Sequence, residues 1–262
     1  MPSASSDGYK RSKKAIKNCF TQVKSNYQIV IFKFSNQFMY QHFFKRLIDF
    51  ILAVFAFIIL SPFLIPISII LLLTGEHEVL YLQKRVGLKN SRFKIWKFAT
   101  MMKNSSKMGT GSLTVRNDPR VLPIGKFLRK TKINELPQII NVLIGNMSFV
   151  GPRPQMEVDF FKFPEHVQAV IYNSNPGITG IGSIIFRDEE KWISNAAGDK
   201  HEFYKIHIAP YKGELEIWYQ EHLSFYTDFM LIFLTAWVII APKSDLVYTV
   251  FKDLPERPEV LK

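Results

Sequence analysis

The stretch LIDFILAVFAFIILSPFLIPISIILLL, residues 47–73, decides the fold class of this 262-residue chain. It is longer than the roughly 20 apolar residues that span a bilayer. Pro62 and Pro66 lie inside it, and an interior proline removes a backbone hydrogen bond and kinks or breaks a helix. The sequence therefore predicts a membrane-associated helix that is broken at Ser61-Pro62.

Positive charge gathers on both sides of this stretch. Residues 1–46 hold nine Lys and Arg against one Asp, and residues 84–132 hold fourteen against one. Because Lys and Arg prefer the cytoplasmic side of a membrane, a helix that enters, bends at Ser61-Pro62 and returns keeps both blocks inside. The Ser61 hydroxyl is a candidate partner for a backbone group freed at the bend. The alternative is a kinked helix that crosses the membrane, since spanning helices tolerate proline.

The composition narrows the class of protein. Hydrophobic residues make up 47% of the chain, 23 residues are Phe, and the formal net charge is +12. A basic chain binds nucleic acid, anionic lipid or a phosphate-bearing substrate. The single cysteine, Cys19, excludes an intramolecular disulfide framework and favours a reducing compartment.

Three regions follow from these patterns: a basic and aromatic extension (1–44), a re-entrant membrane helix-hairpin (45–75) and a cytoplasmic, membrane-associated domain (76–262). The predicted fold class is α+β and mostly helical, with interfacial helices. Residues 27–44 are expected to form an interfacial lead-in helix. We expect a hairpin of strands over 78–87 and 92–98, and helices within 117–130, 135–146, 155–173, 200–221 and 225–241, where the apolar part 229–241 suits an interfacial or buried helix. Gly145 is the predicted stop of the second of these helices.

The candidate catalytic and ligand-binding residues follow the membrane stretch in the sequence. Arginine grips phosphate oxygens bidentately, and Arg153 stands between two prolines in GPRP (151–154), a rigid setting for a phosphate ligand. Glu135 lies close to several cations, which would keep it ionised and ready to bind a metal or act as a base. The alternative is helix capping, because Asn134 is a good N-cap residue and Glu135 suits a first turn. No His/Cys cluster has zinc spacing, whereas Mg²⁺ held by a carboxylate and substrate phosphates fits.

At this point the chain resembles the monotopic polyprenyl-phosphate phosphoglycosyl transferases, a family of bacterial sugar transferases, and looks like the small type. The resemblance covers roughly residues 45–245 and rests on motifs that occur in order. They are KRLID (45–49), the Ser61-Pro62 break, QKRVG (83–87), KFATM (97–101), NDPR (117–120), GKFLRKT (125–131), NELPQIINVLIGNMSFVGPRP (134–154) and PGITG (176–180).

The resemblance implies transfer of a sugar-1-phosphate from a nucleotide diphospho-sugar, of the UDP type, to polyprenyl (undecaprenyl) phosphate, which initiates surface polysaccharide or glycoconjugate synthesis. It implies Mg²⁺, a location on the cytoplasmic face of the bacterial inner membrane, and contact with membrane lipids. By matching position, Arg153 would hold a phosphate and Arg129 would support the hinge of Ser61 and Pro62. The further residues expected to bind phosphate or substrate are Arg120, Arg85 and Lys97. The oligomeric state is open, and a homodimer is one option.

Two departures from the family pattern bear on the mechanism. Family members carry an Asp-Glu pair in which the Asp attacks the diphosphate, whereas this chain has Asn134-Glu135. The familiar KFRTM is KFATM here, with Ala99 in place of arginine. An amide is a poor nucleophile, so Glu135 or Asp118 would have to replace it. Alternatively, the lipid phosphate attacks directly while Glu135 holds Mg²⁺.

Three hypotheses remain at this stage. The first is an active phosphoglycosyl transferase. The second is a catalytically impaired relative that binds lipid phosphate or a pathway partner. The third is a basic, membrane-associated nucleic-acid binder, in which neither the proline-bracketed Arg153 nor the membrane hinge has a role. We expect no nucleic-acid partner.

Overall fold

The computed structural model describes residues 37–108, 117–196, 198–242 and 244–261. The chain divides into two units, residues 1–44 and 45–262. In the first unit the described residues 37–44 are helical and include the π-helix Tyr40–Phe44. The rest of the predicted N-terminal extension, with Cys19, lies outside the described residues.

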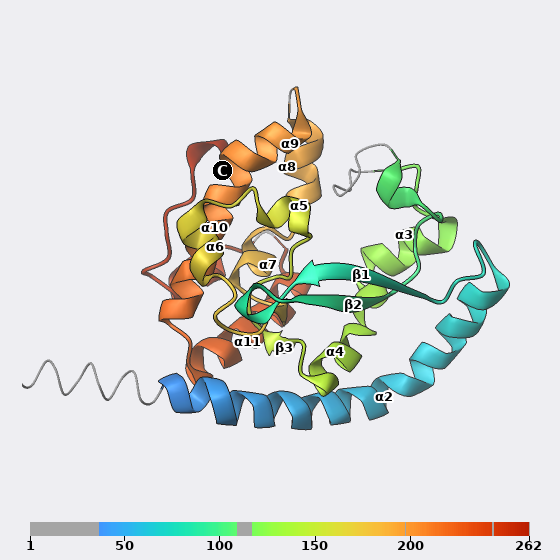
Figure 1. Ribbon diagram of the computed structural model, residues 1–262, viewed down its shortest axis with the longest axis horizontal. Helices are drawn as coiled ribbons and strands as arrows, with labels where there is room; N and C mark the ends of the chain where they lie inside the picture. The colour runs from blue at the N-terminus through green and yellow to red at the C-terminus, as the bar shows by residue number, and fades with distance from the viewer. Residues whose placement is uncertain (1–36, 109–116, 197, 243, 262) are drawn as a thin grey trace, which may run out of the picture. The chain divides into compact units, whose positions relative to one another are not determined.

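The second unit is mostly helical with small sheets, which confirms the α+β class (Figure 1). Its strands are β1 (Leu80–Val86), β2 (Arg92–Phe98), β3 (Ser148–Val150) and β4 (Gly177–Thr179). Its helices are α2 (Lys45–Leu73), α3 (Pro123–Lys130), α4 (Gln138–Ile144), α5 (Glu157–Phe160), α6 (Glu165–Val170), α7 (Ile181–Ile185), α8 (Glu189–Asn195), α9 (Lys200–Phe203), α10 (Ala209–Glu221), α11 (Phe225–Ile240) and α12 (Leu246–Val250). Shorter 3-10 or π turns are η2 (Leu88–Asn90), η3 (Ser105–Lys107), η4 (Ile133–Glu135), η5 (Tyr204–Ile208) and η6 (Glu259–Leu261).

The apolar stretch forms one continuous helix, α2, with both prolines inside it. The predicted break at Ser61-Pro62 is therefore absent, although the ribbon bends in its C-terminal, cyan half (Figure 1). Pro62 has no N–H to offer the Ile58 carbonyl four residues earlier, and the Ser61 hydroxyl donates to that carbonyl instead, at 3.0 Å. A local side-chain bond thus replaces the missing backbone bond, and the helix bends without unwinding.

Polar side chains in the first turns of α2 fasten it to the globular part. The Lys45 ammonium is buried, 2.5 Å from Asp228 Oδ2 on α11 and 2.8 Å from the Val150 carbonyl. Arg46 donates to the carbonyls of Val142 and Leu143, at 2.5 and 2.8 Å, and so caps the C-terminal end of α4. These bonds satisfy carbonyls that a helix end leaves without partners. They also fix the direction in which α2 leaves the domain.

Apolar packing holds the rest of α2. Ala53 packs with Ile95, Val142 and Met147 in one buried cluster. Near the other end, Leu71 packs with Phe98 and Leu128 in a second. Most of the remaining apolar side chains of α2 are exposed, for example Phe55, Ile59 and Phe63. The helix therefore rests on the domain along one side and presents an apolar surface on the other.

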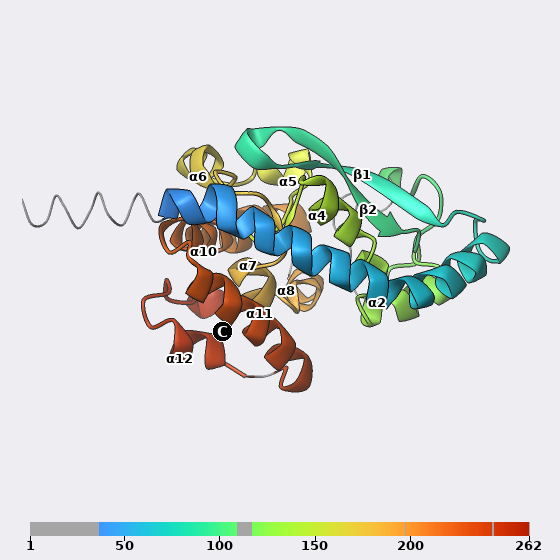
Figure 2. The same ribbon diagram turned by 90° about the horizontal axis from the view of Figure 1, so that it is seen from below.

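The predicted hairpin is confirmed: β1 and β2 pair antiparallel, with Arg85 opposite Phe93 and Tyr81 opposite Lys97. Helix α4 lies between this hairpin and α2, and Figures 1 and 2 show the three stacked in that order. Gly145 ends α4 in the left-handed conformation, as predicted, with φ of 91°. The capping interpretation of Asn134 is wrong, because Asn134 lies inside the turn η4, and α4 begins after Pro137 without a side-chain cap.

The loops GPRP and PGITG meet through their backbones. Strands β3 and β4 pair in parallel, with Val150 opposite Thr179. A Cβ on Gly177 would lie 2.2 Å from the Gly151 nitrogen, and one on Gly180 would lie 2.2 Å from the Gly151 oxygen. Only glycine allows this approach, which sets the position of Arg153 two residues later.

The C-terminal half departs from prediction at one helix. The expected helix over 155–173 is two short helices, α5 and α6, because Pro164 cannot continue α5 and instead precedes α6. The helical stretch over 200–221 is confirmed as α9, η5 and α10. Helix α11 buries Leu231 and Leu234 and exposes Phe229 and Phe233, as an amphipathic helix does.

Candidate active site

The site forms where β2 meets the turn η4. Lys97 lies on β2, and its Nζ is 3.4 Å from Glu135 Oε1. Both side chains are largely buried. Glu135 reaches this place because a 3-10 turn, entered through Lys132 with a φ of 60°, redirects the chain between α3 and α4. The turn thus directs one carboxylate toward the sheet.

Arg153 completes an ion-pair cluster around Glu135. Its Nη2 lies 2.9 Å and its Nη1 3.5 Å from the two Glu135 oxygens, which is a bidentate arrangement. The loop behind it is fixed by Tyr172, whose hydroxyl donates to the Arg153 carbonyl at 2.9 Å and accepts from the Gln155 N–H at 2.8 Å. The Arg153 side chain remains 35% exposed, so its guanidinium also has surface with which to reach a substrate.

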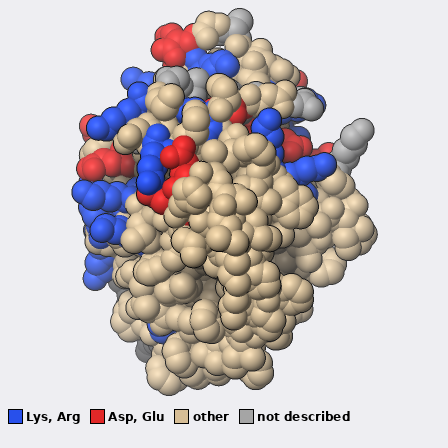
Figure 3. All heavy atoms as spheres, turned by 90° about the vertical axis from the view of Figure 1, so that its right-hand side faces the viewer, with Lys and Arg blue, Asp and Glu red and all other residues tan. Residues whose placement is uncertain are grey.

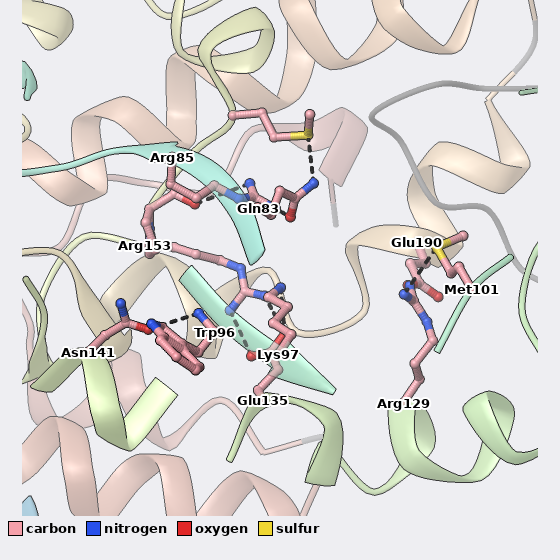
Figure 4. A network of polar contacts seen from close by, with 12 residues as sticks. Gln83, Arg85, Trp96, Lys97, Met101, Arg129, Glu135, Asn141, Arg153 and Glu190 are labelled. Carbon is pink, nitrogen blue, oxygen red and sulfur yellow. Dashed lines mark hydrogen bonds and ion pairs between the residues drawn. The ribbon is translucent and has the colours of Figure 1, made fainter. Parts of the chain in front are cut away.

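Arg85 adds a third cation from β1. Its Nη1 donates to the Pro154 carbonyl at 3.2 Å and its Nη2 to Gln83 Oε1 at 2.6 Å, while its Nε is buried without a hydrogen-bond partner among the described residues. Figure 4 shows Arg153 and Lys97 pointing toward Glu135 from separate segments of the chain, whereas Arg85 points toward Gln83. Two cations, Arg153 and Lys97, thus contact one carboxylate while Arg85 lies near Arg153, and the cluster carries a net positive charge.

The pKa values follow from this crowding. Burial alone would raise the pKa of Glu135, but Arg153 and Lys97 hold it well below its usual value. Burial lowers the pKa of Lys97 to about 7, although Glu135 opposes that shift. Burial and the neighbouring Arg153 lower the pKa of Arg85 to about 10. Glu135 is therefore an ionised carboxylate at neutral pH, and the cluster favours an additional anion.

Asn134 is buried beside this cluster in the sequence, but it takes no part in its ion pairs. Its Oδ1 has no hydrogen-bond partner in the described part of the chain. A buried amide oxygen without a partner and a carboxylate are both oxygen donors of the kind that a hard cation such as Mg²⁺ takes. The described residues contain no group of three or more His, Cys, Asp or Glu that could hold a metal. Substrate phosphates and water would have to supply the remaining ligands, as is usual for Mg²⁺.

Two predicted phosphate ligands lie in other contacts. Arg129 Nη2 is 3.3 Å from Glu190 Oε1 and its Nη1 lies 3.8 Å from Met101 Sδ, and Figure 4 shows this group apart from the Glu135 cluster. Arg129 thus forms its side-chain bonds with Glu190 and Met101 and not with Ser61 or Pro62, which lie within α2 of the described structure. Arg120 is buried, and its Nε and Nη2 donate to the two oxygens of Asp118. That pair anchors the loop after η3, since Arg120 also donates to the carbonyls of Ser105 and Met108. The Asp118 carboxylate is accordingly engaged rather than free to replace a nucleophile.

Sequence reasoning missed the residue that joins α4 to β2. Asn141 is fully buried; its Nδ2 donates to the Lys94 carbonyl at 2.8 Å and its Oδ1 accepts the Trp96 N–H at 2.9 Å. The available signal was an amide within an apolar helix, where a buried polar group requires partners.

Comparison with known proteins gives a consistent result. A family model described as "Bacterial sugar transferase" matches residues 40–242. A UDP-N-acetylgalactosamine-undecaprenyl-phosphate N-acetylgalactosaminephosphotransferase of Aeromonas hydrophila is 31% identical over 76% of this chain and 44% of its own length. A UDP-glucose:undecaprenyl-phosphate glucose-1-phosphate transferase of Klebsiella pneumoniae is 34% identical over 73% of this chain and 39% of its own. The exopolysaccharide production protein ExoY of Rhizobium meliloti is 28% identical over 73% of this chain and 83% of its own length. The chain spans less than half the length of the first two relatives.

Proposed function

Because the chain belongs to the bacterial sugar transferase family, we propose that it transfers a sugar-1-phosphate from a UDP-sugar to undecaprenyl phosphate or a related polyprenyl phosphate. The observation that carries this proposal is the pair of cations, Lys97 and Arg153, on the carboxylate of Glu135, with Arg85 close to Arg153. A diphosphate brings the negative charge that such a cluster lacks. Arginine and lysine side chains are the usual ligands of its oxygens.

The proposed membrane arrangement rests on how α2 is held. A helix of 29 residues is about 43 Å long, enough to cross a bilayer. However, Lys45 and Arg46 fasten its first turn, and Leu71 fastens its end, to the same globular unit. A domain cannot lie on both sides of a membrane, so this supports a bent helix that enters and leaves at one face. That face would be the cytoplasmic one, where both basic blocks are favourable.

The exposed surfaces support the same arrangement. Helix α2 lies in the one helical stretch of the described residues, Gln37–Leu73, that is long and apolar enough to span a membrane. Helix α11 is shorter and also exposes apolar side chains. In Figure 3 the lower part of the molecule, where α2 lies in Figure 1, carries few charged side chains, whereas charges gather above it. A lipid-linked acceptor would therefore reach the cluster from the apolar side.

We propose direct transfer in this chain. An oxygen of the acceptor phosphate bonds to the sugar-bearing phosphorus of the donor while the bond from that phosphorus to the bridging oxygen breaks. The electron pair leaves with the nucleoside monophosphate. Lys97 and Arg153 would neutralise the charge on the transferred phosphoryl group. Bound Mg²⁺, held by the Glu135 carboxylate and the side-chain Oδ1 of Asn134, would supply Lewis acidity at the diphosphate.

The residues themselves favour this route over a covalent intermediate. Asn134 carries an amide, which is not a nucleophile of the kind that forms such intermediates. The Glu135 carboxylate is already neutralised by Lys97 and Arg153. The second candidate function is a catalytically impaired relative that binds lipid phosphate, and the amide at position 134 is the observation that favours it.

The test uses the purified full chain with undecaprenyl phosphate, Mg²⁺ and a panel of UDP-sugars, and measures released nucleoside monophosphate. The Asn134→Asp variant is assayed alongside, with Asn146→Asp as the matched control, because Asn146 is exposed. Turnover by the natural chain supports the transferase. No turnover by the natural chain and turnover by Asn134→Asp would support the impaired relative.

A second measurement separates the two chemical routes. A covalent phospho-sugar intermediate allows labelled UMP to exchange into the UDP-sugar in the absence of acceptor. Direct transfer predicts no exchange by the natural chain, even where it shows full turnover with acceptor. Exchange by the natural chain would overturn the direct route while leaving the transferase activity intact.

A further inference from the structure

The free edge of β2 is closed by one side chain rather than by a third strand. Strand β2 pairs with β1 on one side only, since the described sheet has two strands. On the other side, the Lys94 carbonyl and the Trp96 N–H face α4. Buried backbone groups of this kind require partners. Asn141 provides both, because its amide carries a donor and an acceptor on one plane.

The direction of the Asn141 amide is determined by these contacts. The Nδ2 must face the Lys94 carbonyl, and the Oδ1 must face the Trp96 N–H, as Figure 4 shows for the bond to Trp96. Without protonation of a carboxyl group, no other residue type of this size offers a donor and an acceptor together. An Asp of equal shape would accept from Trp96 but would oppose the Lys94 carbonyl with a second acceptor. The site therefore requires an amide.

This junction lies between the two halves of the ion-pair cluster. Lys97 follows Trp96 directly on β2, and Glu135 precedes α4 in the turn η4. The 3.4 Å separation between Lys97 Nζ and Glu135 Oε1 therefore depends on where β2 lies against α4. Val142, the next residue of α4, packs with Ile95 and Ala53, but apolar packing permits sliding that a paired hydrogen bond does not.

We propose that Asn141 is the positioning residue of the site: it sets the register of β2 against α4 and so holds Lys97 at Glu135. The proposal rests on the proposed function only for its effect on turnover. Its structural part, the register of β2 on α4, stands without that function.

The first test does not depend on turnover. Hydrogen–deuterium exchange of β2 is compared in the natural chain, Asn141→Leu and Asn146→Asp. We expect faster exchange at the Trp96 amide in Asn141→Leu and none of this effect in Asn146→Asp, whose side chain is exposed. Equal protection of Trp96 in all three proteins would overturn the proposal. In the same experiment, the exchange of peptides from α10 and α11 shows whether the variant has kept its fold elsewhere.

The second test uses the isosteric Asn141→Asp variant. We expect kcat to fall by about tenfold or more at a pH of about 8, as small misplacements of a catalytic group do, with KM for undecaprenyl phosphate unchanged. A carboxyl buried against a carbonyl has a raised pKa and donates to Lys94 once it is protonated. The ratio of variant to natural activity should therefore recover as the pH is lowered to about 6.

A ratio that is independent of pH, or a kcat equal to that of Asn146→Asp, would overturn the proposal. If the natural chain turns over no donor at all, the proposed function fails. In that case the hydrogen–deuterium exchange experiment alone still decides the role of Asn141.

Discussion

Arg153 and Glu135 lie 18 residues apart in the sequence, and Arg153 Nη2 meets Glu135 Oε1 at 2.9 Å. The two residues come from different segments, the GPRP loop and the turn η4. Their pairing sets both pKa values, since Arg153 lowers that of Glu135 and Glu135 raises that of Arg153. The arginine is thus held in place by the site's own carboxylate.

Replacing Arg153 by Lys should weaken donor binding. A lysine ammonium cannot hold both Glu135 oxygens and a phosphate in a planar fork. A lost charge-assisted hydrogen bond of about 1.5–3 kcal/mol corresponds to a rise of about tenfold to a hundredfold in the Kd for a UDP-sugar, measured by calorimetry. Arg92→Lys is the control, because Arg92 pairs with Glu157 at the surface. Equal UDP-sugar affinities of the two variants would show that Arg153 does not bind the donor.

The acidity of Glu216 should make stability depend on pH. Glu216 on α10 is 1% exposed and is buried against Gly182. Burial raises its pKa to about 7, although Lys212 opposes the shift. Between its ordinary pKa and this value, the folded chain retains a proton that the unfolded chain has lost. The free energy of unfolding should therefore fall as the pH rises through this range.

Glu216→Gln should remove that dependence. At a pH of about 8 the variant should be more stable than the natural chain, by on the order of 3 kcal/mol at most, and at a pH of about 4 the two should be alike. Thermal unfolding in detergent at a series of pH values measures this. Glu214→Gln, on the exposed side of the same helix, should leave the pH dependence unchanged. A natural chain whose melting temperature is flat across this range would contradict the expectation.

The ion pair of Lys45 and Asp228 should be a point of large destabilisation. Both side chains are less than 10% exposed, and Tyr219 donates to the same carboxylate at 2.8 Å. Asp228→Asn leaves a buried ammonium without its counter-charge, which costs about 3–5 kcal/mol. We expect a clear drop in melting temperature. Asp245→Asn breaks the exposed pair with Arg257 and should cost less than about 1 kcal/mol; similar losses for both variants would contradict a buried anchor.

The glycine contact between the two loops should not tolerate a methyl group. Gly177→Ala places a Cβ 2.2 Å from the Gly151 nitrogen, so β3 and β4 must separate. We expect loss of donor binding and a lower melting temperature. In Gly198→Ala nothing lies within 4 Å of the new Cβ, and only the positive φ of 79° is unfavourable. That variant should lose about 1 kcal/mol and keep donor binding, so the pair separates steric exclusion from general strain.

Local patterns determined a large part of the fold. The strand residues 92–98, the glycine after α4 and the apolar runs at α2 and α11 depend on neighbours within a few residues. The strand, the end of α4 and helix α11 form as predicted, and α2 forms a helix without the predicted break. The helix breaks were harder to predict. At Pro62 the Ser61 hydroxyl bonds to the carbonyl that the proline leaves without a partner, and α2 continues. Pro164, in contrast, divides the helix that was expected over 155–173. Whether a proline breaks a helix depends on the partner available to the freed carbonyl.

The sequence by itself determined that cations, one carboxylate and a membrane helix occur together in this chain. Only the tertiary structure decided which cations reach the carboxylate. Lys97 and Arg153 converge on Glu135, while Arg85 bonds to Gln83, Arg120 pairs with Asp118 and Arg129 pairs with Glu190. The physical reason is that an ion pair depends on distance in space. That distance is set here by the pairing of β3 with β4 and by the hydrogen bonds of Asn141, which join segments far apart in the sequence.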